Sequence, residues 1–268
     1  TMFDIITEKG IFQTDKVIVC TGGLSYPLTG SSGDGYKFAE LAGHKIIAQK
    51  PSLCGLNLKG NDLKKLQGLT LKNVKLNLFI NNKKYNEFFG EMLFTHFGIS
   101  GPIVLSTSSF INRCDLKAVR LSLDFKPALS DEQLDARILR DFDKFKNKDI
   151  SNCLKELLPN AIIPIILERC SIIPTKKINC ITRNERQSLL TTIKNFDMIV
   201  SSLRGFDEAI VTAGGVDVSE VNPKTMESKI VKGMYFCGEV LDIDALTGGF
   251  NLQIAFSTGF AAGNSIKD

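Results

Sequence analysis

This chain is organised around one run of residues, Lys232-Gly-Met-Tyr-Phe-Cys-Gly-Glu-Val-Leu-Asp-Ile-Asp-Ala-Leu-Thr-Gly-Gly-Phe-Asn-Leu-Gln-Ile-Ala-Phe-Ser-Thr-Gly259. Within it, residues 234–237 form a short apolar segment bounded by glycines, which predicts a buried strand that stops at Gly238. Glu239 follows directly at the carboxyl end of that strand. After two adjacent glycines the pattern becomes helical from Asn251. A helix that starts beside a strand end offers free backbone N–H groups to an electron-rich ligand, so this run predicts a cofactor pocket.

The composition is typical of a globular protein and narrows the classes of function. The 268 residues suffice for one or two domains, and the 33 basic and 29 acidic residues leave a net charge of only +4. The lysines are scattered, so nucleic acid is an unlikely partner. The seven cysteines form no CxxC pair and are odd in number, which predicts a reduced, cytoplasmic setting. No signal peptide or long apolar run is present, so no membrane partner is expected, and two unclustered histidines predict no metal site.

The predicted secondary structure changes three times along the chain. The first residues predict a hairpin, a fully apolar strand that ends at Thr21-Gly22-Gly23, and a helix (residues 3–14, 16–20 and 36–42). A series of short strands, with one helix among them, then indicates an antiparallel barrel or sandwich (residues 71–80, 84–89, 91–95, 103–110 and 118–125). A helical region follows, in which Ser130 and Thr182 each begin a capping box (residues 134–145, 150–158, 161–170 and 186–196). Strand character resumes before the terminal run (residues 197–202, 208–213 and 216–218).

Glycine-bearing segments follow several of these strands, at Thr21-Gly22-Gly23, Gly238-Glu239 and Thr247-Gly248-Gly249. In an open α/β sheet, ligands bind at the carboxyl ends of strands, where glycines allow close approach of the backbone. A carboxylate such as that of Glu239 accepts hydrogen bonds from ribityl or ribose hydroxyls. Taken alone, Gly238-Glu239 fits a plain strand-turn better than a ligand site. The combination of the segments points to a flavin site.

Three longer motifs resemble a known family. They are Thr21-Gly-Gly-Leu-Ser-Tyr-Pro-Leu-Thr-Gly-Ser-Ser-Gly-Asp-Gly-Tyr36, Gly90-Glu-Met-Leu-Phe-Thr-His-Phe-Gly-Ile-Ser-Gly-Pro102, and the region from Ala213-Gly-Gly-Val-Asp217 to Phe256-Ser-Thr-Gly259. Together they closely resemble the BaiN/RdsA/YhiN-type NAD(P)/FAD-dependent oxidoreductases, some of which are named aminoacetone oxidases. The resemblance implies an α/β fold (α+β overall): a partial two-dinucleotide-binding-domain-type FAD fold with an inserted antiparallel β-barrel and a small helical subdomain.

The same resemblance implies a division into three parts. Residues 1–50 and 225–268 would be the remnant of the FAD-binding domain. Residues 51–129 and 197–224 would form the barrel, and residues 130–196 the helical subdomain. No segment has the strand, GxGxxG and helix that hold the FAD pyrophosphate, since the glycines from Gly30 to Gly35 lie in a long loop. We therefore expect a fragment that lacks its amino-terminal βαβ region, is inactive and does not bind FAD tightly alone.

By carry-over from the family, ten residues would line the FAD site: Thr21, Gly22, Gly23, Gly238, Glu239, Asp242, Gly248, Gly249, Asn251 and Leu252. His96 is the catalytic candidate, because a histidine facing the flavin could donate a proton or contact substrate. It could equally satisfy a backbone carbonyl. Ser25 and Tyr26 could add hydroxyls to the same cavity, whereas Cys237 has the position of a core residue.

The expected activity is flavin-mediated hydride transfer between NAD(P)H, or a small organic substrate, and an acceptor. One alternative is an RNA-associated flavoprotein similar to tRNA-modification enzymes, because the helical region carries basic residues (Arg137, Arg140, Lys144, Lys146 and Lys148). Acidic residues are interleaved with them, at Asp135, Asp141 and Asp143, and favour a solvated face. A non-catalytic fragment that binds a partner is the other alternative. The sequence leaves the substrate, the electron acceptor and the oligomeric state open.

Overall fold

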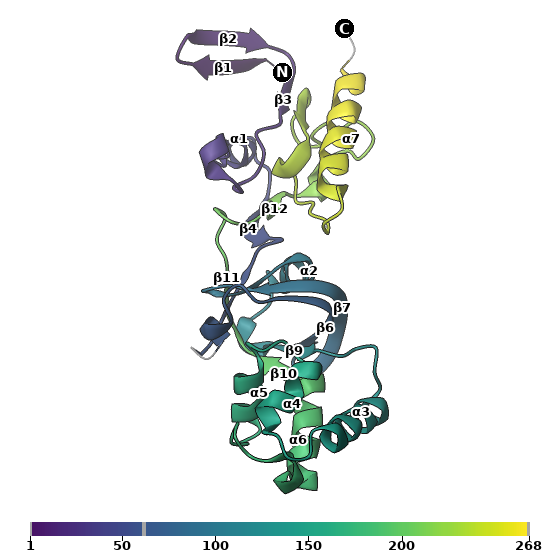
Figure 1. The fold of residues 1–268 in the computed structure, drawn as a ribbon. Helices are drawn as coiled ribbons and strands as arrows, with labels where there is room; N and C mark the ends of the chain where they lie inside the picture. The colour runs from purple at the N-terminus through teal and green to yellow at the C-terminus, as the bar shows by residue number, and fades with distance from the viewer. Residues whose placement is uncertain (1, 61–62, 267–268) are drawn as a thin grey trace. The chain divides into compact units, whose positions relative to one another are not determined.

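The computed structural model describes residues 2–60 and 63–266, which divide into two compact units (Figure 1). Described residues among 1–54, 108–113 and 204–268 make up the first unit. Those among 55–107 and 114–203 make up the second. Both units combine helices with sheets, so the mixed α/β class is confirmed. The two-dinucleotide-binding-domain type and the three-part division stay predictions.

The first unit is built from short strand pairs flanked by helices. Its strands are β1 (Phe3–Thr7), β2 (Gly10–Thr14), β3 (Val17–Val19), β4 (Ile46–Ser52), β12 (Val211–Val216) and β13 (Met234–Phe236). Its helices and 3-10 turns are η1 (Pro27–Thr29), α1 (Asp34–Leu41), η6 (Val218–Glu220), η7 (Gly238–Val240) and α7 (Phe250–Ser265). The β1–β2 and β4–β12 pairs are antiparallel, whereas β3 and β13 are parallel. The predicted hairpin, the strand before Thr21, the buried strand before Gly238 and the terminal helix are therefore confirmed, although Ile18 of β3 is 38% exposed.

The predicted strand over residues 216–218 is wrong beyond Val216. The Asp217 side chain accepts a hydrogen bond from the backbone N–H of Ser219 at 2.9 Å, and this cap starts the 3-10 turn η6. Asp and Asn side chains commonly offer the backbone such an alternative to strand pairing. The local side-chain bond thus overrides the β-branched pattern.

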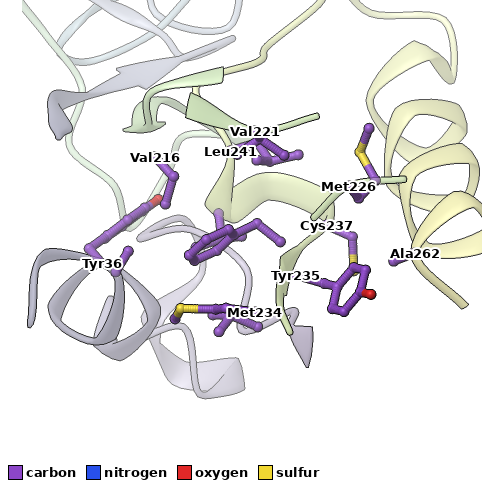
Figure 2. Packing of buried hydrophobic residues seen from close by; sticks show 13 residues of the cluster. Tyr36, Val216, Val221, Met226, Met234, Tyr235, Cys237, Leu241 and Ala262 are labelled. Carbon is purple, nitrogen blue, oxygen red and sulfur yellow. The ribbon is translucent and has the colours of Figure 1, made fainter. Parts of the chain in front are cut away.

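The core of the first unit gathers around β13. Phe236 and Val240 are fully buried there with Tyr36 of α1, and Tyr235 and Cys237 lie on the side toward Ala262 of α7 (Figure 2). Apolar residues on both faces of β13 fit a parallel strand covered on both sides. The strand is thereby held firmly where its carboxyl end meets the site described below.

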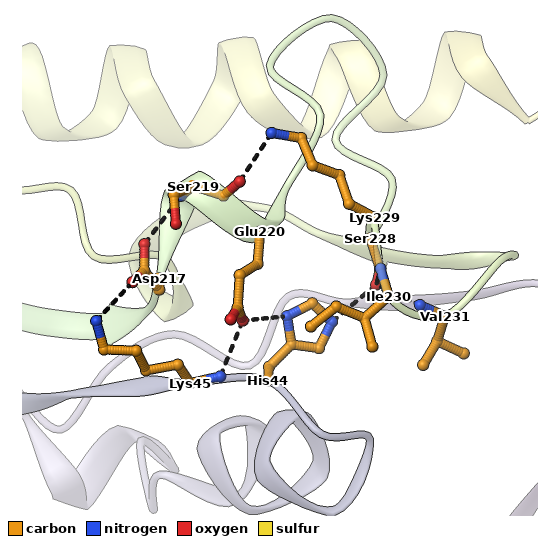
Figure 3. Close-up of polar contacts among 9 residues, drawn as sticks. All are labelled: His44, Lys45, Asp217, Ser219, Glu220, Ser228, Lys229, Ile230 and Val231. Atoms are coloured by element: carbon orange, nitrogen blue, oxygen red, sulfur yellow. Dashed lines mark hydrogen bonds and ion pairs between the residues drawn. The ribbon is translucent and has the colours of Figure 1, made fainter.

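A buried histidine fastens the end of α1 to the loop before β13 (Figure 3). Ser228 Oγ accepts the backbone N–H groups of Ile230 and Val231 at 3.0 and 2.8 Å. Its hydroxyl proton is therefore available to His44 Nε2, 2.8 Å away. His44 Nδ1 lies 3.1 Å from Glu220 Oε2, to which it donates in this tautomer. His44 thus serves as a structural connector between these segments.

The second unit contains one seven-stranded antiparallel sheet and a group of helices. Its strands are β5 (Leu56–Leu58), β6 (Thr70–Ile80), β7 (Lys83–Phe94), β8 (Gly98–Ser100), β9 (Val119–Asp124), β10 (Phe196–Met198) and β11 (Val200–Leu203). Its helices are α3 (Asp131–Lys144), α4 (Ile150–Cys153), α5 (Ile163–Arg169) and α6 (Arg183–Lys194), with 3-10 turns η2 (Leu63–Leu66), η3 (Leu116–Ala118), η4 (Leu154–Glu156) and η5 (Ile178–Cys180). Helix α2 (Pro102–Ile111) runs from this unit into the first.

The predicted antiparallel barrel is not found as a closed barrel. The strand order is β10-β9-β6-β7-β8-β5-β11, and among the described residues no ladder joins β10 to β11. These two edge strands are consecutive in the chain, separated only by Ile199, whose carbonyl accepts the N–H of Lys59 at 2.9 Å. One extended segment therefore pairs with β9 through its first half and with β5 through its second.

Three predicted elements of this unit have different bounds, two strands and one helix. The strands predicted over 84–89 and 91–95 are one strand, β7, because its pairing with β6 resumes at Val74 and Gly90 after a bulge on β6. The helix predicted over 150–158 ends at Cys153 and continues only as the 3-10 turn η4. In both cases a local irregularity decides the bounds, and the hydrophobic pattern does not reveal it.

Both predicted capping boxes are present. Ser130 and Gln133 exchange side-chain to backbone hydrogen bonds at the start of α3, as do Thr182 and Glu185 at the start of α6. The boxes satisfy N–H groups that a helix start leaves without partners. Within the described residues, no helix is both long and apolar enough to cross a lipid bilayer.

Replacing Thr182 by Ala should lower the free energy of unfolding by about 1 kcal/mol, because a cap acceptor is lost. Urea denaturation followed by circular dichroism measures this change. Thr191→Ala is the matched control, since Thr191 is an exposed residue in the interior of the same helix. Alanine favours a helix interior, so Thr191→Ala should have little effect or stabilise slightly. Equal destabilisation by both variants would contradict the capping role.

Candidate functional site

The candidate site lies at the carboxyl ends of the parallel strands β3 and β13. Their register pairs Val19 with Phe236, so the chain leaves both strands at the same edge. Gly238 turns away with φ 76°, a left-handed conformation that glycine adopts freely. Its N–H donates to Thr258 Oγ1 of α7 at 2.9 Å. The end of β13 is thereby attached to the middle of the terminal helix.

The carboxylate of Glu239 connects three segments of this edge. Its Oε1 accepts the backbone N–H of Thr212, on β12, at 2.8 Å. Thr212 Oγ1 in turn accepts the N–H groups of Leu24 and Ser25 at 2.8 and 3.1 Å. One short polar network thus connects β12 and the loop after β3 to Glu239, in the 3-10 turn η7 after β13.

Gly23 leaves the space that this network needs. A Cβ atom added there would lie 2.4 Å from Glu239 Oε1 and 2.5 Å from Thr212 Oγ1. Both atoms take part in the hydrogen bonds just described, so neither can move without loss. The glycine is therefore required for close approach, since its φ is not in the left-handed region.

Burial raises the pKa of the Glu239 carboxyl above its ordinary value of 4.5. Hydrogen bonds from Thr212 oppose this shift, and the nearby charge of Asp244 adds to it. A carboxyl group with a raised pKa inside a cavity is typical of functional sites.

Two cavities of about 490 and 280 Å³ adjoin Glu239. Both are lined by Gly238, Glu239 and Ala255. The larger is also lined by Ile18, Cys20, Gly22, Cys237 and Gly259, and the smaller by Ile210, Val211, Ile243, Asn251, Leu252 and Ile254. The larger volume falls within the roughly 300–1,000 Å³ of small-molecule sites.

Four other residues expected from the sequence, Thr21, Asp242, Gly248 and Gly249, are not among the residues that line these two cavities. Thr21 lines a separate apolar cavity of about 620 Å³, beside β1 and α1. Asp242 Oδ1 accepts hydrogen bonds from Arg113, at 2.6 Å, and from the Gly214 N–H, at 3.1 Å. It therefore connects protein segments. Gly248 and Gly249 are exposed in the loop before α7.

Asn251 uses its side chain to shape the loop before α7. Its amide accepts the N–H of Ala245 at 2.9 Å and donates to the carbonyl of Ala245 at 2.8 Å. Gly249, with φ 88°, caps the helix without any side-chain hydrogen bond. The first amides of this 16-residue helix are thus free of a side-chain cap, beside the cavity that Asn251 and Leu252 line.

His96 belongs to the second unit, unlike the ten expected cofactor residues. It is exposed in the turn between β7 and β8, with its ring edge-on to Phe97 at 5.1 Å between centroids. Its proposed catalytic role stays a prediction. Of the two hydroxyls expected near the site, Ser25 is buried against Thr212, whereas Tyr26 is exposed.

Sequence reasoning missed Thr212, the central donor and acceptor of the Glu239 network. It also missed Ser52, whose hydroxyl donates to Asp244 at 2.7 Å, and Arg113, the partner of Asp242. These partners lie far from the terminal run in sequence. The one available signal is that Thr212 precedes Ala213-Gly214-Gly215, a glycine pair at the end of a predicted strand.

Comparison with known proteins identifies the family. A family model described as HI0933-like protein barrel and H2TH domain matches residues 50–211, which is more than half of the chain. The chain belongs to this HI0933-like family. The resemblance that its motifs suggested is therefore confirmed.

Individual relatives are similar to nearly the whole chain. A 3-dehydro-bile acid delta(4,6)-reductase from Clostridium scindens is 31% identical over 99% of this chain and 65% of its own length. Ribosomal RNA dihydrouridine synthases from Escherichia coli and Haemophilus influenzae are 31% and 32% identical, over 94% and 96% of this chain. The chain spans 60% and 61% of their lengths, so it corresponds to about three fifths of these curated relatives.

Replacing Gly23 by Ala should destabilise the first unit by roughly 1–3 kcal/mol, because the new methyl group forces the Glu239 network apart. The free energy of unfolding measures this directly. Gly205→Ala is the control, since a Cβ there meets nothing within 4 Å. A Gly23→Ala protein as stable as the control variant would contradict the described packing.

The raised pKa of Glu239 predicts a pH dependence of stability. A raised pKa means that the folded state binds the carboxyl proton more tightly than the unfolded state does. The resulting contribution to the free energy of unfolding is fully present below the usual pKa of 4.5. It is lost as the pH rises through the raised pKa. Glu239→Gln keeps an oxygen for the Thr212 N–H but does not titrate. Urea unfolding between about pH 4 and about pH 8 should therefore show a steeper decline in the wild type than in Glu239→Gln. Parallel curves would contradict the shift.

Proposed function

We propose that the chain is part of an FAD-dependent oxidoreductase and supplies the portion of the site next to the flavin ring and ribityl chain. The observation that carries this proposal is the cavity at the ends of β3 and β13, where glycines and a carboxyl of raised pKa meet the start of a long helix. FAD, when bound, supplies the hydride-transfer chemistry itself. The name of the Clostridium scindens relative, a reductase, supports this class of activity.

In this proposal each group has a defined task. Gly22 and Gly238 allow a planar group to approach the backbone, and Ala255 and Gly259 keep the facing side of α7 free of large side chains. Glu239 accepts hydrogen bonds from sugar-like hydroxyls. The free amides at the start of α7 stabilise negative charge beside the cavity. These tasks fit a flavin without using a catalytic side chain.

The substrate is proposed to be an unsaturated ring that gains hydrogen. The relatives' names have reduction in common, because one is a bile acid reductase and dihydrouridine is the reduced form of uridine. FAD held beside Gly22, Gly238 and Glu239 would supply the hydride-transfer chemistry for such a reduction. NADH or NADPH as that reductant stays a prediction.

RNA as substrate is the second candidate, favoured by the names of the two synthases. The helical part of the second unit argues against a strongly basic surface. Arg137 pairs with Asp141 at 2.9 Å, and Arg186 pairs with Asp135 at 2.8 Å. Lys176 and Lys177 pair in the same way with Glu185 and Asp149. We therefore place a small-molecule substrate ahead of RNA.

Rapid-mixing measurements on the intact protein test the proposal. Mixing its oxidised form with NADH or NADPH should bleach the flavin absorbance, and an enone or a uridine-containing RNA should then restore it. Glu239→Ala should weaken FAD retention, and Lys224→Ala, at an exposed turn, is the control. An intact protein without flavin, or with flavin that neither reductant bleaches, would contradict the proposal.

Two further measurements separate the alternatives. We expect the 268-residue chain not to bind FAD tightly alone, so a yellow purified chain would overturn that expectation. RNA binding that weakens steeply with salt would move RNA ahead of a small molecule.

A further inference from the structure

Two cysteines on neighbouring strands line the larger cavity. Cys20 directly follows β3 and Cys237 directly follows β13. The parallel register pairs Val19 with Phe236, and the Cys237 N–H donates to the Val19 carbonyl at 3.2 Å, so the ladder continues to this next pair. Both cysteines line the same cavity of about 490 Å³. Their side chains therefore point to the same face.

The spacing of neighbouring strands suits a disulfide. Adjacent strands lie about 4.8 Å apart, and bridged cysteines have Cα atoms roughly 4.4–6.8 Å apart. The backbone ladder places Cys20 and Cys237 opposite each other on these neighbouring strands. Both cysteines are free in the structure, so the pair is in its dithiol form.

The two thiols differ in access. Cys20 is exposed, whereas Cys237 is buried, with 6% of its surface accessible. Burial, together with the neighbouring Cys20 thiol, raises the pKa of Cys237 to about 11. An accessible thiol next to a buried partner is the arrangement of a reacting and a resolving cysteine.

We propose that Cys20 and Cys237 form a reversible dithiol–disulfide site, oxidised by a low-molecular-weight disulfide of the glutathione type. The proposal concerns the thiols themselves and does not depend on flavin binding in the cavity. It requires only that a small disulfide reaches Cys20, which is exposed.

The reaction proceeds by two exchanges. The Cys20 thiolate attacks one sulfur of glutathione disulfide, whose S–S bond breaks, and the first glutathione leaves as a thiolate that takes up the proton lost by Cys20. The Cys237 thiolate then attacks the Cys20 sulfur of the mixed disulfide, and the second glutathione leaves and takes up the proton lost by Cys237. Two protein thiols are oxidised to one disulfide, and one glutathione disulfide is reduced to two thiols.

The disulfide would join the ends of β3 and β13 in the lining of the cavity. It would replace two thiols beside Gly22, Gly238 and Glu239 by a rigid bridge. Oxidation would thus alter the wall of the cavity without moving either strand.

The test uses the whole 268-residue chain under native conditions. The reduced chain is treated with glutathione disulfide, remaining thiols are blocked, and tryptic peptides are analysed by mass spectrometry without reduction. We expect the peptide after Lys16 to be joined to the peptide after Lys232, with the loss of two hydrogens, and dithiothreitol should restore both thiols. A wild-type chain that stops at a mixed disulfide on Cys20, or leaves Cys20 unmodified, would overturn the proposal.

Variants make the test specific. Cys237→Ser should trap glutathione on Cys20, and Cys20→Ser, at the exposed position, should leave Cys237 as a free thiol. Cys180→Ser is the control, because Cys180 is also exposed but its sulfur contacts Asn179 Oδ1. This control should form the Cys20–Cys237 bridge as readily as the wild type. A bridge whose yield falls equally in all three variants would contradict the assignment.

Discussion

The hydrogen bond from the Thr212 amide to the Glu239 carboxylate is the interaction on which the site depends. It joins β12 to the segment that follows β13, and the Thr212 hydroxyl extends the connection to Leu24 and Ser25. Three parts of the chain that are distant in sequence are thereby held around one carboxyl group. This network gives the loop after β3 and the turn after β13 a common polar anchor.

The same interaction explains the local sequence. Glu239 is withdrawn from water, which raises its pKa, and the donors on Thr212 limit that cost. Gly23 is needed because any Cβ would displace the carboxylate or the hydroxyl. The larger cavity is lined by Gly22, Gly238, Ala255 and Gly259 among others, and Glu239 is the acidic residue in its lining.

Features that depend on neighbouring residues could be predicted from the sequence. The capping boxes at Ser130 and Thr182 need only a hydroxyl and a carboxyl or amide three residues later. The strand before Gly238 and the helix after Gly249 follow from apolar runs and glycines. The three long motifs were also specific enough to indicate the family, which the HI0933-like family model then confirmed.

Features set by distant contacts could not be predicted. Nothing near Glu239 in sequence indicates Thr212, and nothing near Asp242 indicates Arg113, because both pairs form only when the first unit folds. The edge strands β10 and β11 lie on one short segment of the chain, and they pair with β9 and β5. The expected barrel depended on pairings between distant strands, which the hydrophobic pattern of one strand does not encode. The turn at Asp217 followed a local side-chain bond that competed with its strand pattern.

The most direct test of this account is a crystal structure of the intact protein with its flavin bound. The account predicts flavin density against Gly22, Gly238 and Glu239, with the ring beside the start of α7 and the Thr212–Glu239 hydrogen bond intact. Flavin bound elsewhere, with this cavity empty or filled by protein side chains, would contradict it.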